Sequence, residues 1–181
     1  MFGFGILILG VYSVKNGYRS IVLWHEREAS SVNSFSAWWK VLWKLKIQNK
    51  IKVFLWHASS NALPYKVNLF SKRVVSNMAC IRCGSARESI FHAIWACPKV
   101  DNVWALLPCA SFQCGDDRWG DFGAFCGQLS TLKKGEGLEL FAMIAWFIWF
   151  DINEIVQGRK GHLGEVLIVA VMSYFKSFSM A

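Results

Sequence analysis

The sequence lacks acidic residues over a long segment, because no Asp or Glu occurs between Ala29 and Arg87. The same segment holds ten Lys and Arg residues, and the remaining residues carry ten basic and twelve acidic side chains, so the segment contributes +10 and the rest −2 to the formal net charge of +8. Such a segment attracts polyanions of any base sequence by releasing condensed counterions. A solvated basic face without a partner remains the alternative.

Signatures of catalysis are also missing. We find no glycine-rich phosphate-binding loop and no Gly-x-Ser-x-Gly sequence. Asp116 and Asp117 form the only adjacent acidic pair, and they lie in a Gly-rich stretch. Two-metal phosphoryl transfer needs carboxylates that converge from rigid elements, so this pair is more typical of solvated turn residues. We therefore expect no enzymatic activity, no catalytic residue and no small-molecule substrate.

Neither a secretory signal nor a membrane span is evident. The apolar start Met1–Gly10 has no basic n-region and is shorter than the ~18–20 residues of a span. The run from Leu138 to Phe150 contains Glu139 and is followed by Asp151, which indicates a buried helix. We expect a nuclear or cytoplasmic protein that is not secreted and has no membrane partner.

Four residues have the spacing of a metal site, Cys80-x2-Cys83-x8-His92-x4-Cys97. Two cysteines separated by two residues form a knuckle in which both thiolates face one ion, at Zn–S distances of ~2.3 Å. Gly84 allows the tight turn that brings backbone N–H groups toward the sulfurs. A closed set of one imidazole and three thiolates favours structural Zn2+. The alternative is a set of buried thiols and an ordinary helix histidine.

The remaining cysteines lack a partner at ligand spacing, and we predict that they are free thiols. They are Cys109, Cys114 and Cys126.

Apolar spacing predicts mostly helices. The predicted helical stretches are Ala37–Leu45, Ile51–Ala62, Tyr65–Arg73, Glu88–Trp95, Asp101–Leu107, Leu138–Val156 and Leu163–Phe178. Alternation predicts a short strand in Gly10–Tyr18, and Cys109–Leu129 is predicted to be irregular. The expected fold class is mainly α: a small, irregular, zinc-stabilised helical domain with a short N-terminal β segment and a C-terminal helical appendage.

A series of short motifs resembles a known family. In chain order they are Trp43-Lys-Leu-Lys, Lys50-Ile-Lys-Val-Phe-Leu-Trp56, Asn61-Ala-Leu-Pro64, Asn68-Leu-Phe, the Cys80/Cys83-Gly84 knuckle, Glu88-Ser89, His92, Cys97-Pro98 and Val103-Trp104. Their order resembles the zinc-binding domain of plant non-LTR (LINE-type) retrotransposon reverse transcriptases. The later Ala145-Trp-Phe-Ile-Trp149 and Asn153 resemble the segment that follows this domain, although Ile152 replaces the usual arginine.

The resemblance implies a zinc-binding module that lies downstream of a polymerase domain, often ahead of a ribonuclease H domain, and handles element RNA or DNA. This chain has no Tyr-x-Asp-Asp motif and is too short for a complete ribonuclease H, so we expect a piece of a degenerate element or a small protein derived from one. The predicted organisation is an unassigned start (1–9), a reverse-transcriptase-type zinc-binding domain (10–108), an irregular linker (109–137) and a C-terminal helical segment (138–181).

We predict low-specificity binding of RNA or single-stranded DNA through basic side chains interleaved with aromatic ones. The candidate residues are Lys40, Lys44, Lys46, Lys50, Lys52, Arg73, Arg82 and Arg87. In the alternative reading, the aromatic residues belong to the core. Zinc would then pin a structural scaffold that docks a polymerase or ribonuclease H domain of a parent element.

Overall fold

The computed structural model describes residues 32–105, 121–132, 136–161, 169 and 171–173. The chain divides into two compact units, Met1–Asn33 and Ser34–Ala181, and the description below concerns the second. The predicted strand Gly10–Tyr18, the acidic pair Asp116/Asp117 and most of the predicted helix 163–178 lie outside the described residues. Cys109 and Cys114 lie outside them as well.

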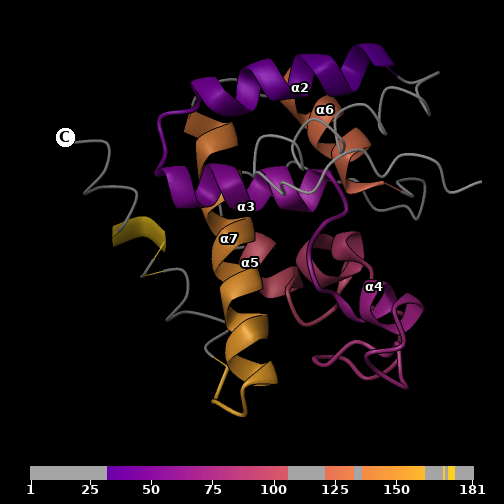
Figure 1. Ribbon diagram of the computed structural model, residues 1–181. Helices are drawn as coiled ribbons and strands as arrows, with labels where there is room; N and C mark the ends of the chain where they lie inside the picture. Colours follow the sequence, from indigo (N-terminus) through magenta and orange to yellow (C-terminus); the bar gives the residue numbers. More distant parts are fainter. Residues whose placement is uncertain (1–31, 106–120, 133–135, 162–168, 170, 174–181) are drawn as a thin grey trace, which may run out of the picture. The chain divides into compact units, whose positions relative to one another are not determined.

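Within these ranges the fold is helical, as predicted, with one isolated antiparallel bridge between Ala79 and Arg87. The elements are α2 (Val32–Lys44), α3 (Asn49–Ser59), α4 (Lys66–Ser71), the π-helix η1 (His92–Ala96), α5 (Asp101–Ala105), α6 (Phe122–Leu132) and α7 (Glu136–Val156) (Figure 1).

Helix α3 ends earlier than its apolar pattern predicts. Asn61 adopts a left-handed backbone with φ 55°, and asparagine tolerates this conformation better than most residues. Its side chain accepts a hydrogen bond from the Tyr65 hydroxyl, while the Asn68 amide donates to the Leu63 carbonyl at 2.9 Å. These bonds account for the two asparagines of the sequence motifs, because they hold the turn that separates α3 from α4.

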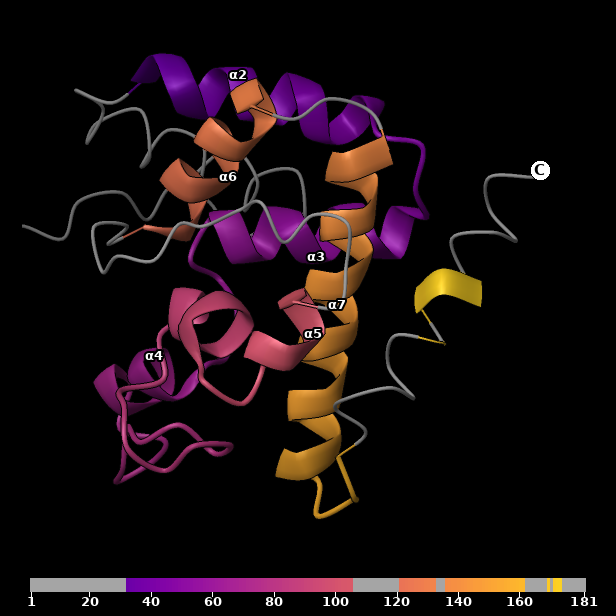
Figure 2. The same ribbon diagram turned by 180° about the vertical axis from the view of Figure 1, so that it is seen from behind.

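The core forms where α7 packs against α3 and η1 while α6 packs against α3 (Figures 1 and 2). It includes an aromatic cluster of four rings, Trp95, Trp104, Phe125 and Phe141, which come from η1, α5, α6 and α7. Neighbouring rings have centroids between 4.7 and 6.2 Å apart in tilted, stacked and edge-on arrangements. These geometries add to the gain from burying large apolar areas.

Helix α6 is a correction to the predicted irregular stretch, which runs to Leu129. Its Gly123 and Gly127 lower helix propensity, yet both are buried in α6, so tertiary packing overrides that preference. Asp121 supports the start of the helix, because its Oδ1 accepts a hydrogen bond from the Gly123 N–H at 3.0 Å.

Helix α7 confirms the predicted helix over Leu138–Val156 but is more than an appendage. Leu138, Phe141, Ile144 and Ile148 are completely buried, and Ile152 is 2% exposed. The helix is therefore part of the core of the second unit. None of the helices in the described ranges has the length and apolar character needed to cross a bilayer.

Candidate metal centre

The knuckle that carries Cys80 and Cys83 is a tight loop closed by backbone hydrogen bonds. The Cys80 N–H donates to the Ala86 carbonyl and the Gly84 N–H donates to the Cys80 carbonyl, both at 2.8 Å. Gly84 has φ 72°, a backbone conformation that residues other than glycine rarely adopt. The glycine after the second cysteine thus makes the turn that the sequence predicts.

His92 and Cys97 are placed by the π-helix η1. A π-helix closes its hydrogen bonds over five residues, and these two residues are five apart, so both come to one side of the turn. The Ser89 hydroxyl accepts a hydrogen bond from the His92 N–H, and the Trp104 indole donates to the Ile94 carbonyl, each at 3.0 Å. The motif residues Ser89 and Trp104 therefore hold the start and the middle of this turn.

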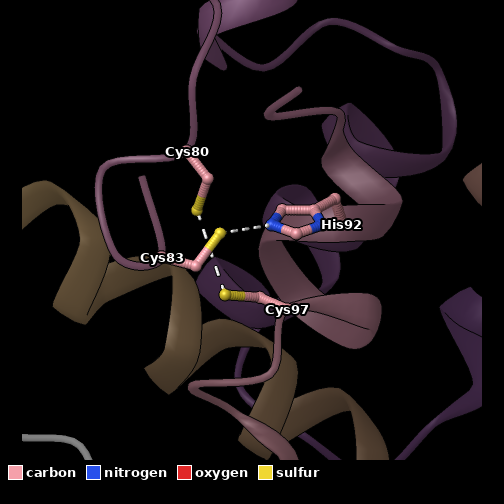
Figure 3. Close-up of side chains that lie close together, drawn as sticks. All are labelled: Cys80, Cys83, His92 and Cys97. Carbon is pink, nitrogen blue, oxygen red and sulfur yellow. Dashed lines mark hydrogen bonds between the residues drawn. The ribbon is translucent and has the colours of Figure 1, made fainter. Parts of the chain in front are cut away.

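The four predicted ligands converge, and their side chains point toward one another (Figure 3). One ligand atom from each of Cys80, Cys83, His92 and Cys97 lies within 4.8 Å of the others. The Cys80 and Cys97 sulfurs are 3.9 Å apart, and the Cys83 sulfur is 3.4 Å from His92 Nε2. Tetrahedral zinc with Zn–S of ~2.3 Å and Zn–N of ~2.05 Å requires separations of about 3.8 and 3.6 Å. The donor set and its dimensions fit zinc.

The protonation of the cluster is uneven. Burial tends to raise the pKa of Cys80, but hydrogen bonds from His92 and from the backbone of Cys83 and Arg82 outweigh it and lower that pKa. The backbone N–H of Ala86, with further hydrogen bonds from Ser85, lowers the pKa of Cys83 to about 5. Burial raises the pKa of Cys97, and the hydrogen bond to Cys80 raises that of His92. Hydrogen bonding thus favours the thiolate form of Cys83 and Cys80, whereas burial favours the protonated thiol of Cys97.

Arg82, between the two knuckle cysteines, points into the protein. Its guanidinium makes an ion pair of 3.0 Å with Asp151 of α7, and both side chains are only 2% exposed. It also donates to the carbonyls of Ala93 and Ile148. Arg82 is consequently not available to a phosphate, and its place among the predicted nucleic-acid-binding residues is a correction. Its buried charge joins the knuckle to η1 and α7 instead.

Glu88 is a positioning residue that sequence reasoning names only as part of a motif. Its carboxylate is 2% exposed and accepts hydrogen bonds from the backbone N–H of Lys66 at 3.1 Å and of Ile81 at 3.0 Å. The carboxylate thus holds the start of α4 against the knuckle. The available signal was its place in the sequence, as the first acidic residue after the acid-free segment.

The other predicted nucleic-acid-binding residues lie at or near the surface. Lys52 is half-buried and donates to the Trp43 carbonyl at 3.1 Å. The exposed ones are Lys40, Lys44, Lys46, Lys50, Arg73 and Arg87. Their role in binding stays a prediction.

The aromatic residues interleaved with these lysines divide between core and surface. Trp38 and Phe54 are buried, as the core interpretation expects, whereas Trp43 is 46% exposed. His57 packs against Trp56 with ring centroids 4.5 Å apart, and burial lowers its pKa.

Comparison with known proteins gives two findings. The model of a family described as zinc-binding in reverse transcriptase matches residues 12–104, just over half of the chain. The chain is also 22% identical over 143 residues to "Putative ribonuclease H protein At1g65750" of Arabidopsis thaliana. That alignment covers 77% of this chain and 22% of the relative, so this chain spans less than a quarter of the relative's length. No solved structure matches.

Proposed function

This chain belongs to the family of reverse-transcriptase zinc-binding domains, and from that premise we propose that it is a module that holds one Zn2+ and binds single-stranded nucleic acid. Cys80, Cys83, His92 and Cys97 would hold the ion in a closed, structural site. The observation that carries this proposal is the gathering of their ligand atoms within 4.8 Å of one another, with two of the separations, 3.9 and 3.4 Å, close to tetrahedral edges. Zinc would supply folding free energy to the knuckle rather than chemistry.

The nucleic-acid part of the proposal is supported by charge. The acid-free segment carries ten basic residues, and seven of them are exposed, namely Lys40, Lys44, Lys46, Lys50, Lys72, Arg73 and Arg87. Contacts from such side chains to phosphates are insensitive to base sequence and sensitive to salt. RNA and single-stranded DNA of a retroelement are therefore the ligands that we propose.

The origin of the module follows from the same premise. We propose that it derives from the reverse transcriptase polyprotein of a non-LTR retrotransposon, where polymerase or ribonuclease H domains would be its neighbours. The Arabidopsis relative is named as a ribonuclease H protein, and this supports such an origin. We further propose that the module works by binding and not by catalysis. Its thiolate ligands would suit a reducing compartment, the nucleus or cytosol.

Metal content tests the zinc site. We expect about one zinc per purified chain and loss of that zinc in Cys80→Ser. Cys126→Ser is the matched control, because Cys126 is a fully buried cysteine of α6 that lies outside the cluster. Retention of zinc by Cys80→Ser, or its loss from Cys126→Ser alone, would refute the assignment.

A salt titration of binding to a mixed-sequence single-stranded RNA tests the second part. Replacing Lys40 and Lys44 together by Gln should weaken binding and reduce the salt slope by about 1 per lysine. Lys99 and Lys160, which are exposed but lie outside the acid-free segment, provide the matched double control. Absence of binding at low salt would contradict nucleic-acid binding and leave the zinc site untouched.

A second candidate function is a zinc-stabilised scaffold that docks another protein domain without binding nucleic acid. The exposed apolar side chains of α7, Phe150 at 47% and Val156 at 60%, favour this candidate. It predicts that the zinc-loaded chain binds no RNA at low salt.

A further inference from the structure

Helix α4 ends in a turn that holds an arginine in an unfavourable backbone conformation (Figure 1). The Val74 N–H donates to the Leu69 carbonyl at 2.9 Å. The Arg73 N–H donates to the Phe70 carbonyl, also at 2.9 Å. This pair of bonds is a Schellman motif, whose left-handed position is usually taken by glycine. Arg73 occupies that position with φ 59°, although glycine would cost less free energy there.

An open hollow of about 690 Å³ lies beside this turn, and we call it the α4 hollow. It is lined by Phe70, Ser71, Arg73, Val74, Val75 and Ser76. The residue after the left-handed position of a Schellman motif often packs back on the helix, but Val74 is 65% exposed. Phe70 is 41% exposed. The hollow therefore combines a half-exposed aromatic ring and other apolar side chains with a guanidinium.

The charge around the α4 hollow is positive. Lys72 and Arg73 are exposed, and both belong to the acid-free segment. Neither side chain makes an ion pair or a hydrogen bond with the residues that the structure describes. Glu88 bonds to the Lys66 N–H at the opposite end of α4, and its buried carboxylate is engaged by two backbone N–H groups. Two uncompensated cations beside an apolar surface complement a nucleotide, which offers a flat base next to a phosphate.

We propose that the α4 hollow holds one nucleotide of a single strand, with the base against Phe70 and a phosphate bound by Arg73 beside Lys72. Residues kept in strained backbone conformations are concentrated at functional sites. A guanidinium offers a phosphate two parallel N–H bonds, which glycine at this position could not supply. This inference rests on the proposed nucleic-acid binding and adds the position at which a nucleotide is held.

Replacing Arg73 by glycine separates binding from folding. Arg73→Gly should leave the unfolding temperature unchanged or raise it, because glycine suits the left-handed position. Binding of a labelled oligothymidylate to the zinc-loaded full chain should weaken, and the salt slope should fall by about 1. Arg159→Gln is the matched control, since Arg159 is exposed but paired with Glu154 outside the acid-free segment. Unchanged binding by Arg73→Gly would overturn the inference.

Variants of Phe70 test the contact with the base. Phe70→Ala should weaken binding about tenfold with an unchanged salt slope, because stacking releases no counterions. Phe70→Trp should retain binding, and Phe70→Leu should lose it, because leucine has no aromatic face. Phe150→Ala is the matched control, since Phe150 is 47% exposed on α7, outside the acid-free segment. Full binding by Phe70→Leu, or equal losses in Phe70→Ala and Phe150→Ala, would overturn the inference.

The competing occupant of the α4 hollow is an acidic protein segment, and a labelled polyglutamate peptide is the probe for it. The peptide should bind more weakly than oligothymidylate, because it has no base to place against Phe70. Equally tight binding of both probes, lost together in Arg73→Gly, would overturn the nucleotide site while nucleic-acid binding stands. Zinc content of each variant reports whether the fold is intact. Failure of the unsubstituted chain to bind oligothymidylate at low salt would refute both proposals.

Discussion

The knuckle and the aromatic cluster are ordered by different means. Around Cys80 and Cys83 the chain folds as turns held by backbone hydrogen bonds, and its neighbours Gly84, Ser85 and Arg87 are exposed. The cluster of Trp95, Trp104, Phe125 and Phe141 is held by aromatic burial. The knuckle has too little apolar surface for burial alone to offset the entropy lost on ordering. Metal binding by its gathered ligand atoms would supply the missing free energy.

The two regions meet at η1, which supplies His92 to one and Trp95 to the other and is followed directly by Cys97. Arg82 and Asp151 form a second link, from the knuckle to α7. Loss of the metal or of a buried apolar side chain should therefore destabilise the two regions to different degrees. Loss of the Arg82–Asp151 ion pair should destabilise both.

Loss of metal should produce the largest difference between the regions. Chelation of zinc, or Cys97→Ala, should remove on the order of 10 kcal/mol of metal-binding free energy from the knuckle. Amide hydrogen exchange should then show lost protection around Cys80–Glu88 and retained protection in α7 at Phe141–Ile148, which packs on α3. Equal loss of protection in both would contradict the distinction.

Loss of apolar volume should act mainly on the aromatic cluster. Phe141→Ala should lower the free energy of unfolding by about 3–5 kcal/mol, because Phe141 is completely buried among three rings. Zinc content should stay near one ion per chain. Leu132→Ala is the control, since Leu132 is 64% exposed and its loss should change stability by less than about 0.5 kcal/mol. Denaturant unfolding with metal analysis checks both.

Breaking the link should weaken both regions. Asp151→Asn leaves the buried Arg82 cation without its charged partner and should cost about 3 kcal/mol. Arg82→Met combined with Asp151→Leu removes both charges and should restore stability to within about 1 kcal/mol of the parent. Denaturant unfolding of the two variants provides the comparison. A double variant as unstable as Asp151→Asn would show that the ion pair itself is needed.

The smallest expected effect is that of pH on the knuckle. Zinc must displace the proton of Cys97, whose pKa is raised by burial, and the raised pKa of His92 keeps its imidazole protonated to higher pH than usual. Zinc affinity should therefore fall as pH falls, about tenfold per pH unit for each proton displaced, or about 1.4 kcal/mol. Titration calorimetry in buffers of different ionisation enthalpy counts the protons released. Affinity that does not change between pH 8 and 6 would contradict this assignment.

The metal-free protein should show the opposite trend at His92. A raised folded-state pKa stabilises the fold below the unfolded value of 6.5, and this contribution disappears as pH rises through the folded pKa. Cys83 acts in the other direction, because a folded-state pKa lowered to about 5 contributes stability that is present above its unfolded value and is lost as pH falls through about 5.

Most of the correct predictions came from the spacing of the cysteines and from the helical spacing of apolar residues. The Cys80/Cys83 knuckle, its Gly84 and the long helix α7 are all readable because each depends on residues near one another in the chain. Helix α6 was not readable, because its glycines are tolerated only through burial against other elements. Arg82 was misassigned, since its partner Asp151 lies 69 residues away and no local pattern reveals the pair.

The sequence by itself determined the donor set, the helical character of the described core and the basic segment, because these follow from residue types and short-range periods. Only the tertiary structure decided that α7 belongs to the core, that the Arg82 side chain is buried in an ion pair with Asp151, and that Phe150 remains 47% exposed on α7. Those outcomes depend on which distant side chains share the limited buried volume, and the free energy of such packing is set by contacts between helices rather than within them.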